Sequence, residues 1–298
     1  MASLNFFRAF RHGSRSYNTR VGEWWVRQST DASHKRAYKK IAAHIRRALR
    51  RYRIPAPHIL VDYACGTGEM LKYLALEFPS ATLVALDGSG KMLRFALKNL
   101  TRQKMDAEMV LLESAFRKTG PRVRLVQSAL PNFSLSPRKA DAVLFLFPNM
   151  NFSATEKRYI EARLGRNAPV LAMARLLSRM WEDAEGKSRR AQKRIFEELL
   201  QERILSRNVH QLLRRGGLWF KVEYSNLPRH ELSELEQWRM LFAEAAWHPV
   251  LDSRQTEDPF EYLGSKYFRS RVALDVYEQT LDPVDRTGGY FISAFRAL

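Results

Sequence analysis

The feature that most constrains the fold is a turn of small residues between an apolar run and a helix-like stretch. The apolar run at residues 59–61 has the length and the β-branched content of a buried strand. It ends at Asp62, and residues 69–78 follow the turn with apolar side chains at helical spacing. A strand that enters a helix through glycines lets a ligand reach the bare backbone and the free N–H groups of the helix. The turn therefore predicts a ligand site, and a tight turn that binds nothing is the alternative.

A second strand-like run carries an acidic residue at its end. Residues 82–86 are apolar, and Asp87 follows them with a carboxylate suited to a pair of ribose hydroxyls. Together the two strand ends indicate a nucleoside cofactor. A dinucleotide fingerprint is excluded because Leu71 or Glu69 stands where the third glycine is required.

The spacing that is present, Asp62-x-Ala64-x-Gly66-x-Gly68, resembles the motif of the class I S-adenosylmethionine-dependent methyltransferases. The segment that begins at Asp87 is similar to the acidic strand end and the following helix of that family. The resemblance covers residues 17–298, and it implies S-adenosylmethionine as cofactor and S-adenosylhomocysteine as product. In one respect the chain departs from the family, since Ala64 replaces the first glycine, which we interpret as a mild change.

The resemblance also implies the residues around the cofactor. The third strand, at residues 123–126, ends where the family commonly has an acid that accepts a hydrogen bond from the adenine amine. Ser128 stands at that place, and because a hydroxyl accepts the bond more weakly, we expect a weaker adenine contact. The expected cofactor-binding residues are Asp62, Ala64, Cys65, Gly66, Gly68, Asp87, Gly88, Met92, Ser128, Ala129 and Phe147.

The fourth strand, at residues 140–147, ends where this fold positions its substrate. The loop after it differs from the Asn-Pro-Pro-Tyr signature of nucleic-acid amine methyltransferases, which argues against chemistry on base amino groups. We expect Asn149 and Asn151 to be catalytic by orienting the acceptor, and asparagines that cap the next turn are the alternative. The sulfonium of the cofactor is already activated, so alignment supplies most of the acceleration. The sequence contains no catalytic triad and no metal-spaced cluster, and no metal is expected.

The order of the elements predicts an α/β fold. We expect a seven-stranded Rossmann-like methyltransferase sheet flanked by helices, with an N-terminal helical extension and a helical insertion before the fifth strand. The expected bounds are 1–53 for the extension, 54–298 for the methyltransferase domain and about 154–208 for the insertion. Further expectations are a helix at 105–118, the fifth strand at 218–224 and an antiparallel pair that closes the sheet.

Two aromatic segments each allow two interpretations. Residues 17–27 contain Tyr17, Trp24 and Trp25, and in related methyltransferases such a segment often folds over the cofactor as a lid. Packing of these aromatics onto the domain is the alternative. Residues 260–271 interleave aromatics with arginines, which suits either a grip on a ring or phosphate or an edge of the sheet.

The net charge is unusual. The chain has 50 Lys and Arg against 31 Asp and Glu, a net charge of +19. Residues 1–58 carry fourteen of these basic residues against Glu23 and Asp31, a net charge of +12. Within them, residues 33–52 form an amphipathic helix whose polar surface is almost wholly basic. Such an arm favours RNA, phospholipid head groups or a phosphorylated small molecule as partner, and a solubilising surface is the alternative.

The cysteine content and the N-terminal composition indicate the cellular compartment of the protein. The single cysteine, Cys65, excludes an internal disulfide, and no apolar run is long enough to span a membrane. We therefore expect a cytoplasmic protein. Residues 1–20 are rich in arginine and serine without acids, as in a mitochondrial transit peptide, so the mitochondrial matrix is the alternative.

These observations lead us to expect an enzyme that transfers a methyl group to an O, N or C nucleophile of a small, anionic molecule. The long insertion favours a small acceptor over RNA, and no RNA-binding module is recognisable in the sequence. The alternatives are an rRNA or tRNA methyltransferase and a catalytically inactive, RNA-associated assembly factor with this fold. The acceptor atom, a general base and the oligomeric state do not follow from the sequence.

Overall fold

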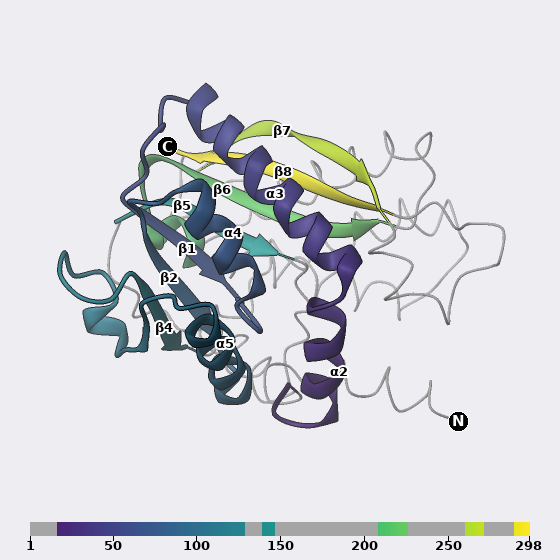
Figure 1. The fold of residues 1–298 in the computed structure, drawn as a ribbon. Helices are drawn as coiled ribbons and strands as arrows, with labels where there is room; N and C mark the ends of the chain where they lie inside the picture. Colours follow the sequence, from purple (N-terminus) through teal and green to yellow (C-terminus); the bar gives the residue numbers. More distant parts are fainter. Residues whose placement is uncertain (1–16, 129–138, 147–207, 226–259, 271–288) are drawn as a thin grey trace, which may run out of the picture.

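A mixed eight-stranded sheet organises the computed structural model, which describes residues 17–128, 139–146, 208–225, 260–270 and 289–298 (Figure 1). The strand order is β3-β4-β2-β1-β5-β6-β8-β7. All strand pairs are parallel except the two that β8 makes with β6 and β7. The strands are β1 (Ile59–Tyr63), β2 (Thr82–Asp87), β3 (Ala107–Met109), β4 (Val123–Gln127), β5 (Ala140–Leu146), β6 (Leu213–Ser225), β7 (Phe260–Arg269) and β8 (Gly289–Ala297).

The chain order reverses between β1 and β5, which pair side by side at the centre of the sheet. From β1 the sheet continues outward to β2 and β4 on one side, and from β5 to β6 on the other. In an open α/β sheet, ligands bind in the crevice beyond the carboxyl ends of the strands at such a reversal. The topology therefore directs attention to the loops that follow β1, β2, β4 and β5.

Helices α3 (Ala32–Arg51), α4 (Glu69–Glu77) and α5 (Gly90–Arg102) lie along the same face of the sheet (Figure 1). Their buried side chains form one apolar cluster with alternate strand residues such as Leu60. The intervening strand residues, Val61 among them, belong to a second cluster on the other face. This alternation follows from the two-residue period of a strand. The predicted apolar stripe of α3 is confirmed, and four of its side chains that reach the core are Tyr38, Ile41, Ile45 and Leu49.

The polar surface of α3 works against helix stability. It places four pairs of like charges at a spacing of four residues, which cost about 1–2 kcal/mol in total. The helix forms because its opposite stripe is buried, with Ile41, Ile45 and Leu49 fully inaccessible to solvent. The pairs are Lys35 with Lys39, Arg36 with Lys40, Arg46 with Arg50, and Arg47 with Arg51.

Residues 105–118 do not form the expected helix. They contain strand β3 and a single 3-10 turn at Leu112–Ser114. The segment pairs with β4 instead, and the backbone N–H of Val110 donates to the carbonyl of Leu125 at 2.9 Å. Backbone pairing at a free sheet edge has therefore overridden a helical spacing of apolar residues. It also gives the sheet eight strands in place of the expected seven.

The last three strands agree with the sequence prediction in type but not in every boundary. The antiparallel closure is confirmed, because β8 runs antiparallel between β6 and β7. The first strand of this pair was expected from residue 250 onward, which lies outside the described residues, whereas β7 begins at Phe260. β7 is an edge of the sheet, which supports the packing interpretation of its aromatics, and Phe268 stacks on Tyr290 at 5.2 Å between ring centroids. β6 begins at Leu213, earlier than the expected start at residue 218. Leu213 pairs with Ala140 of β5, residues 214–217 bulge out, and the pairing resumes at Leu218.

Several predicted segments lie outside the described residues. These are residues 1–16, nearly all of the insertion at 154–208, and the loop that holds Asn149 and Asn151. Among the described residues, none of the helices has the length and apolar character needed to cross a membrane.

Candidate functional site

The loops after β1 and β2 are joined to each other at the carboxyl edge of the sheet. The backbone N–H of Gly66 donates to Oδ2 of Asp87 at 2.8 Å, and that of Ser89 donates to Oδ1 at 2.8 Å. The N–H of Cys65 donates to the carbonyl of Leu86 at 3.0 Å. Among the described residues, each Asp87 oxygen thus uses one acceptor position and keeps another for a ligand.

Asp87 has an unusual proton affinity. Burial raises the pKa of its carboxyl to about 6, although the hydrogen bonds from Ser89 and Gly66 act in the opposite direction. Tyr17 lies close to this carboxyl, since burial and then the charge of Asp87 raise the pKa of the Tyr17 hydroxyl. The end of β2 is therefore a partly covered acidic group next to an aromatic ring from the N-terminal segment.

The turn after β1 requires glycine for two physical reasons. Gly66 and Gly68 have positive φ angles of 53° and 67°, which L side chains adopt at a cost. A Cβ at Gly68 would also come within 2.9 Å of the Ala96 Cβ, and one at Gly66 within 2.8 Å of Nε1 of Trp25. The turn thus lies in close contact with α5 on one side and with a tryptophan on the other.

Ala64 is strained. Its φ angle is +64°, in the left-handed region, where a non-glycine residue costs roughly 1–2 kcal/mol. The exchange of glycine for alanine at this position is therefore not the mild change that the sequence suggested. The strain comes from the backbone conformation, since the side chain that alanine adds is only one methyl group.

Asp62 is a buried carboxylate that has no hydrogen-bond partner among the described residues. Its exposure is 1%, and neither of its oxygens has a partner there. Burial, and secondarily the charge of Asp87, raise the pKa of this carboxyl to about 8. Tyr38 and Glu69 are close, since burial and then the charges of Asp62 and Glu69 raise the pKa of the Tyr38 hydroxyl. Buried acceptors without partners are costly, and they indicate a site for a polar or cationic ligand group.

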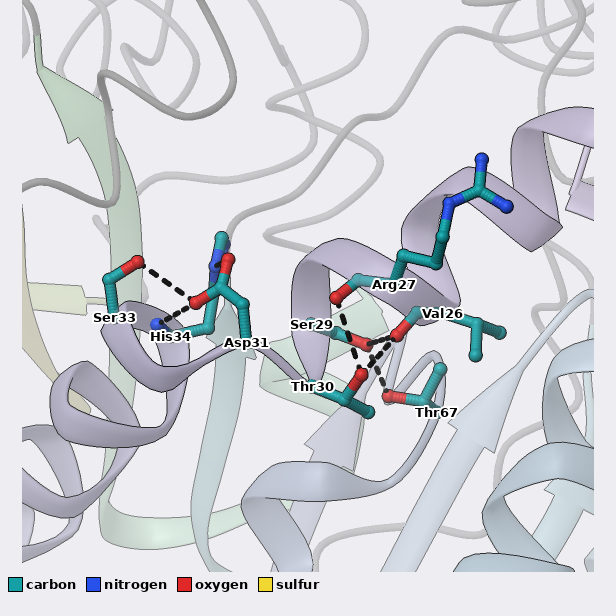
Figure 2. A network of polar contacts seen from close by, with 8 residues as sticks. All are labelled: Val26, Arg27, Ser29, Thr30, Asp31, Ser33, His34 and Thr67. Atoms are coloured by element: carbon teal, nitrogen blue, oxygen red, sulfur yellow. Dashed lines mark hydrogen bonds and ion pairs between the residues drawn. The ribbon is translucent and has the colours of Figure 1, made fainter.

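Helix α2 (Arg20–Ser29) and the residues just before it are tied to both loops. The hydroxyls of Ser29 and Thr67 share a buried hydrogen bond of 2.8 Å (Figure 2). Oδ1 of Asn18 accepts from the hydroxyl of Ser89 at 2.9 Å and from the N–H of Lys91 at 3.1 Å. With the Trp25 indole placed against Gly66, α2 covers the turn.

The junction between α2 and α3 is fixed by Asp31 (Figure 2). Oδ1 of Asp31 accepts from the backbone N–H of His34 at 2.7 Å and from the Ser33 hydroxyl at 2.9 Å, and its Oδ2 lies 3.0 Å from His34 Nδ1. Burial raises the pKa of Asp31, but these bonds outweigh it and the pKa is lowered. The ring of Trp25 meets that of His34 edge-on at 5.9 Å. The position of α2 is therefore set by the N-terminal cap of α3.

Comparison with known protein families identifies the domain. A model of the methyltransferase domain matches residues 61–161, which include the turn after β1 and strands β2 to β5. Residues 61–161 therefore belong to a methyltransferase domain, in agreement with the resemblance seen in the sequence. The match supports S-adenosylmethionine, the cofactor expected from the sequence. No curated protein matches the chain.

Three solved structures are similar to this methyltransferase at low sequence identity. Magnesium protoporphyrin IX methyltransferase (ChlM) of Synechocystis PCC 6803 with bound SAH shares 13% identity and has a TM-score of 0.49, over 96% of this chain and 97% of that one. The cyclase SpnF also shares 13% identity at a TM-score of 0.49, over 89% and 84% of the two chains. The plantazolicin methyltransferase BpumL with SAH shares 12% identity at a TM-score of 0.47, over 99% and 98%.

The expected cofactor residues of the methyltransferase that the structure describes come from the ends of three adjacent strands. The third of these ends joins the second, since the N–H of Ser128 donates to the backbone carbonyl of Asp87 at 2.9 Å. Met92 is buried beneath α2, with its Cε 2.8 Å from the place of a Cβ at Gly22. Ala129, Phe147, Asn149 and Asn151 lie outside the described residues. The described members are Asp62, Ala64, Cys65, Gly66, Gly68, Asp87, Gly88, Met92 and Ser128.

Sequence reasoning missed the polar contacts that tie α2 and Asn18 to the two loops. Asn18, Ser29 and Thr67 were not expected to take part, and no local motif marks them. Their partners are 71 and 38 residues away along the chain. Tyr38 was assigned to the apolar stripe of α3, which is correct for its ring. Its nearness to Asp62 follows from the packing of α3 against the sheet.

The donor set fits S-adenosylmethionine. Asp87 offers free acceptor positions for hydroxyls, the turn offers bare backbone, and Asp62 offers buried carboxyl oxygens that have no partner in the described part of the chain. The cofactor itself supplies an activated methyl group. The task that remains for the protein is to hold the cofactor, to exclude water and to align an acceptor.

Proposed function

We propose that this methyltransferase transfers a methyl group to an O, N or C nucleophile of a small, anionic molecule. The observation that carries the proposal is the tie of α2 to both cofactor loops, made by Ser29 to Thr67 and by Asn18 to Ser89. A covered cofactor suits an acceptor that is enclosed with it, whereas an acceptor within a polymer needs an open approach. The net charge of +19 raises the local concentration of anionic acceptors.

In this proposal the cofactor lies across the ends of β1, β2 and β4. Asp87 accepts hydrogen bonds from both ribose hydroxyls through its free acceptor positions, and Ser128 accepts from the adenine amine. Asp62 pairs with the ammonium of the methionine part, which provides the counter-charge that a buried carboxylate needs. The turn at Gly66 and Gly68 meets the ligand with bare backbone. The remaining proposed contacts are Ala64, Cys65, Gly88, Met92, Ala129 and Phe147.

We also propose that residues 1–53 form the lid and the basic extension of a catalytic domain at residues 54–298. Asn149 and Asn151, just beyond β5, would orient the acceptor, and the insertion at 154–208 would roof it. No general base is assigned, because the reaction requires one only when the acceptor must lose a proton. A cytoplasmic location is part of the proposal and is compatible with the single cysteine, Cys65.

The class of acceptor is tested by isotope transfer. Purified protein is incubated with methyl-tritiated S-adenosylmethionine and an extract divided into small anionic, small neutral or cationic, and RNA fractions. We expect the label in the small anionic fraction, with Asp87→Asn protein as the control that fails to transfer. Label in RNA would replace the proposal by an RNA methyltransferase, and label in the neutral or cationic fraction would remove the anionic acceptor.

The acceptor position is tested separately from the cofactor position. Asn149→Ala and Asn151→Ala should each lower the rate of methyl transfer to the labelled acceptor while the affinity for S-adenosylhomocysteine, measured by calorimetry, stays nearly constant. Asp87→Asn should reduce both quantities. If both asparagine variants transferred the methyl group at the wild-type rate, these two residues would have no role in orienting the acceptor.

A further inference from the structure

The basic residues of α3 form a regular array. Two groups of four occupy the helix, and the second group repeats the first after eleven residues at every position. Eleven residues are close to three helical turns and about 16 Å of rise, so the two groups lie on the same side of the helix. The first group is Lys35, Arg36, Lys39 and Lys40, and the second is Arg46, Arg47, Arg50 and Arg51.

Most of this array has no counter-charge in the part of the chain that the structure describes. The helix contains no acidic residue, and the one ion pair that its cations form among the described residues joins Arg46 to Glu77 at 2.8 Å. Arg51 has its guanidinium over the ring of Tyr52, at 5.7 Å from the centroid. Six members are exposed, and these six are called the α3 basic face: Arg36, Lys39, Lys40, Arg47, Arg50 and Arg51.

The positive surface continues onto the neighbouring strand. His44 lies beside Arg47 and beside Lys266 of β7, and burial followed by these two charges lowers the pKa of its ring to about 4. His44 therefore remains neutral near neutral pH and adds no repulsion of its own. Within β7, Nζ of Lys266 lies 5.5 Å from the centroid of the Phe268 ring. The array is thus bordered by another cation and by aromatic side chains at the edge of the sheet.

Helix stability does not explain the array. Cations near the C-terminus of a helix are favourable, which accounts for Arg50 and Arg51. Lys35 and Arg36 lie near the N-terminus, where the helix dipole favours acids, and the first turn of α3 contains none. Like charges four residues apart also repel one another in both groups. The protein therefore maintains an arrangement that weakens the helix carrying it, which points to an anionic partner.

We propose that the α3 basic face binds the phosphodiester backbone of a nucleic acid, at a surface separate from the methyl-transfer site. Four of the six side chains are arginines, whose planar guanidinium groups match phosphate oxygens in a bidentate geometry. Regularly spaced cations along about 22 Å of helix suit a linear polyanion, and release of its counterions favours binding. This inference goes beyond the proposed function, because the opposite stripe of α3 packs on the sheet and the lid residues belong to α2.

A membrane surface is the less suitable partner. Helices that lie in a membrane interface insert an apolar face between the lipids. The apolar stripe of α3 is already buried in the core, with Ile41, Ile45 and Leu49 inaccessible. No part of α3 is left to insert, and charge alone would have to hold the protein on lipid.

The test compares two variants with the same net charge. In the first, Arg36→Gln, Lys40→Gln, Arg47→Gln and Arg51→Gln remove four members of the α3 basic face. In the matched control, Lys98→Gln, Arg102→Gln, Arg117→Gln and Lys118→Gln remove four exposed cations elsewhere. Full-length proteins, freed of nucleic acid, are titrated by fluorescence anisotropy against a 30-nucleotide RNA strand, its duplex and DNA of the same sequence. The series is repeated from low to high salt and with vesicles of phosphatidylcholine and phosphatidylserine.

We expect the wild type to bind nucleic acid with an affinity that falls steeply as salt rises. The α3 variant should lose at least tenfold in affinity at moderate salt, and its salt slope should fall by about three units, close to one for each lost phosphate contact. The control variant should stay near wild type. Comparison of the RNA and DNA arms then identifies the polymer.

Three results would overturn the inference. They are absence of nucleic-acid binding by the wild type, equal losses in the two variants, and binding to anionic vesicles in place of nucleic acid. Calorimetry with S-adenosylhomocysteine on both variants verifies that the fold is intact, and it separates failure of this surface from failure of the proposed enzyme activity.

Discussion

The backbone N–H of Gly66 lies 2.8 Å from Oδ2 of Asp87, and this bond joins the glycine turn after β1 to the end of β2. The two residues are 21 positions apart, and each belongs to a different predicted motif. Asp87 therefore organises the protein's own loops with one acceptor position on Oδ2 and retains a second one. The same carboxylate that shapes the site is also proposed to hold the ribose, so its protonation affects both.

The first prediction concerns cofactor affinity as a function of pH. Because the pKa of Asp87 is raised to about 6, its carboxylate is ionised above that pH and protonated below it. The ionised form of Asp87 is the better acceptor for hydroxyls. The carboxyl of Asp62, with a pKa of about 8, must also ionise to pair with the ligand ammonium, so the affinity for S-adenosylhomocysteine should already decline from pH 8 to pH 6. Below pH 6, where Asp87 is protonated as well, the affinity should fall by up to about tenfold more per pH unit. Calorimetry from pH 5 to pH 8 measures this profile.

The control for this profile is Asp87→Asn, which keeps the shape of the side chain and removes its titration. We expect it to weaken binding by about 1.5–3 kcal/mol at pH 7.5, the range for a hydrogen bond to a charged group, and to abolish the additional loss below pH 6 that Asp87 causes. A variant that retains the wild-type pH profile would assign the titration to another group.

The second prediction concerns the strained residue at the start of the turn. Ala64 has a φ angle of +64°, and glycine adopts this conformation without steric cost. Ala64→Gly relieves roughly 1–2 kcal/mol in the folded state and loses part of this to the greater freedom of the unfolded chain, for a net gain of about 0.5–1 kcal/mol. Urea unfolding measures the difference.

A matched substitution shows whether the gain depends on conformation. Ala43 lies in the interior of α3, where the same exchange to glycine should destabilise by about 1 kcal/mol. If Ala64→Gly destabilised the protein as Ala43→Gly does, the left-handed conformation at residue 64 would be contradicted.

The central elements could be predicted because their signals are local. The strand before Asp62, the glycine turn and the helix after it follow from apolar spacing and residue type within twenty consecutive positions. The same holds for the amphipathic stripe of α3. At residues 105–118, by contrast, the apolar spacing was compatible with a helix. Part of this segment forms strand β3 instead, because it pairs with the free edge of β4. Whether such a segment forms a helix or a strand depends on tertiary structure, and the sequence of the segment does not indicate which one forms.

Contacts between distant residues could not be read from the sequence. Asp141, at the start of β5, accepts hydrogen bonds from the N–H groups of His58 at 2.6 Å and Ile59 at 3.0 Å, and from Nε of Arg214 at 2.6 Å. It thereby ties the beginnings of β1, β5 and β6 together at the end opposite the site. Burial of a charged group at a strand start indicates such a role in the structure, but nothing in the sequence specifies the partners.

The third prediction concerns the carboxylate of Asp62 without cofactor. Its pKa in the folded protein is about 8, above the ordinary value of 3.8. Its contribution to stability is therefore fully present below pH 4 and is lost as the pH rises through about 8. Asp87 makes a similar contribution that is complete by about pH 6. His44 acts in the opposite direction, because its pKa is lowered from 6.5 to about 4 and its contribution rises until about pH 7, so the interval from pH 7 to pH 8 isolates Asp62 from these two groups. There the free energy of unfolding should fall by up to about 1.4 kcal/mol per pH unit.

Asp62→Asn should remove this slope and leave the apo protein more stable than the wild type at pH 8. Asp106→Asn is the control, because Asp106 is exposed and its Oδ2 accepts from the N–H of Arg122 at 3.0 Å, far from the site. Urea unfolding of the three proteins at pH 6, 7 and 8 gives the comparison. Equal slopes in wild type and Asp62→Asn would mean that Asp62 finds a counter-charge when the cofactor is absent.

The last prediction concerns the tie between the lid and the glycine turn. Ser29 and Thr67 share a buried hydrogen bond of 2.8 Å. Ser29→Ala removes this partner from the Thr67 hydroxyl, and after Thr67→Val the Ser29 hydroxyl keeps only its longer bond to the carbonyl of Val26, at 3.4 Å. Each single change should cost about 1–3 kcal/mol, and the double variant should cost less than the sum by about 1 kcal/mol. If α2 covers the bound cofactor, all three variants should also release S-adenosylhomocysteine faster, which stopped-flow displacement measures. Thr30→Ala is the control at the C-terminal cap of α2, because the Thr30 hydroxyl donates to the carbonyl of Val26 at 2.7 Å and does not reach the turn (Figure 2). Additive costs with an unchanged release rate would show that α2 packs beside the site without closing it, and the argument for an enclosed acceptor would then fail.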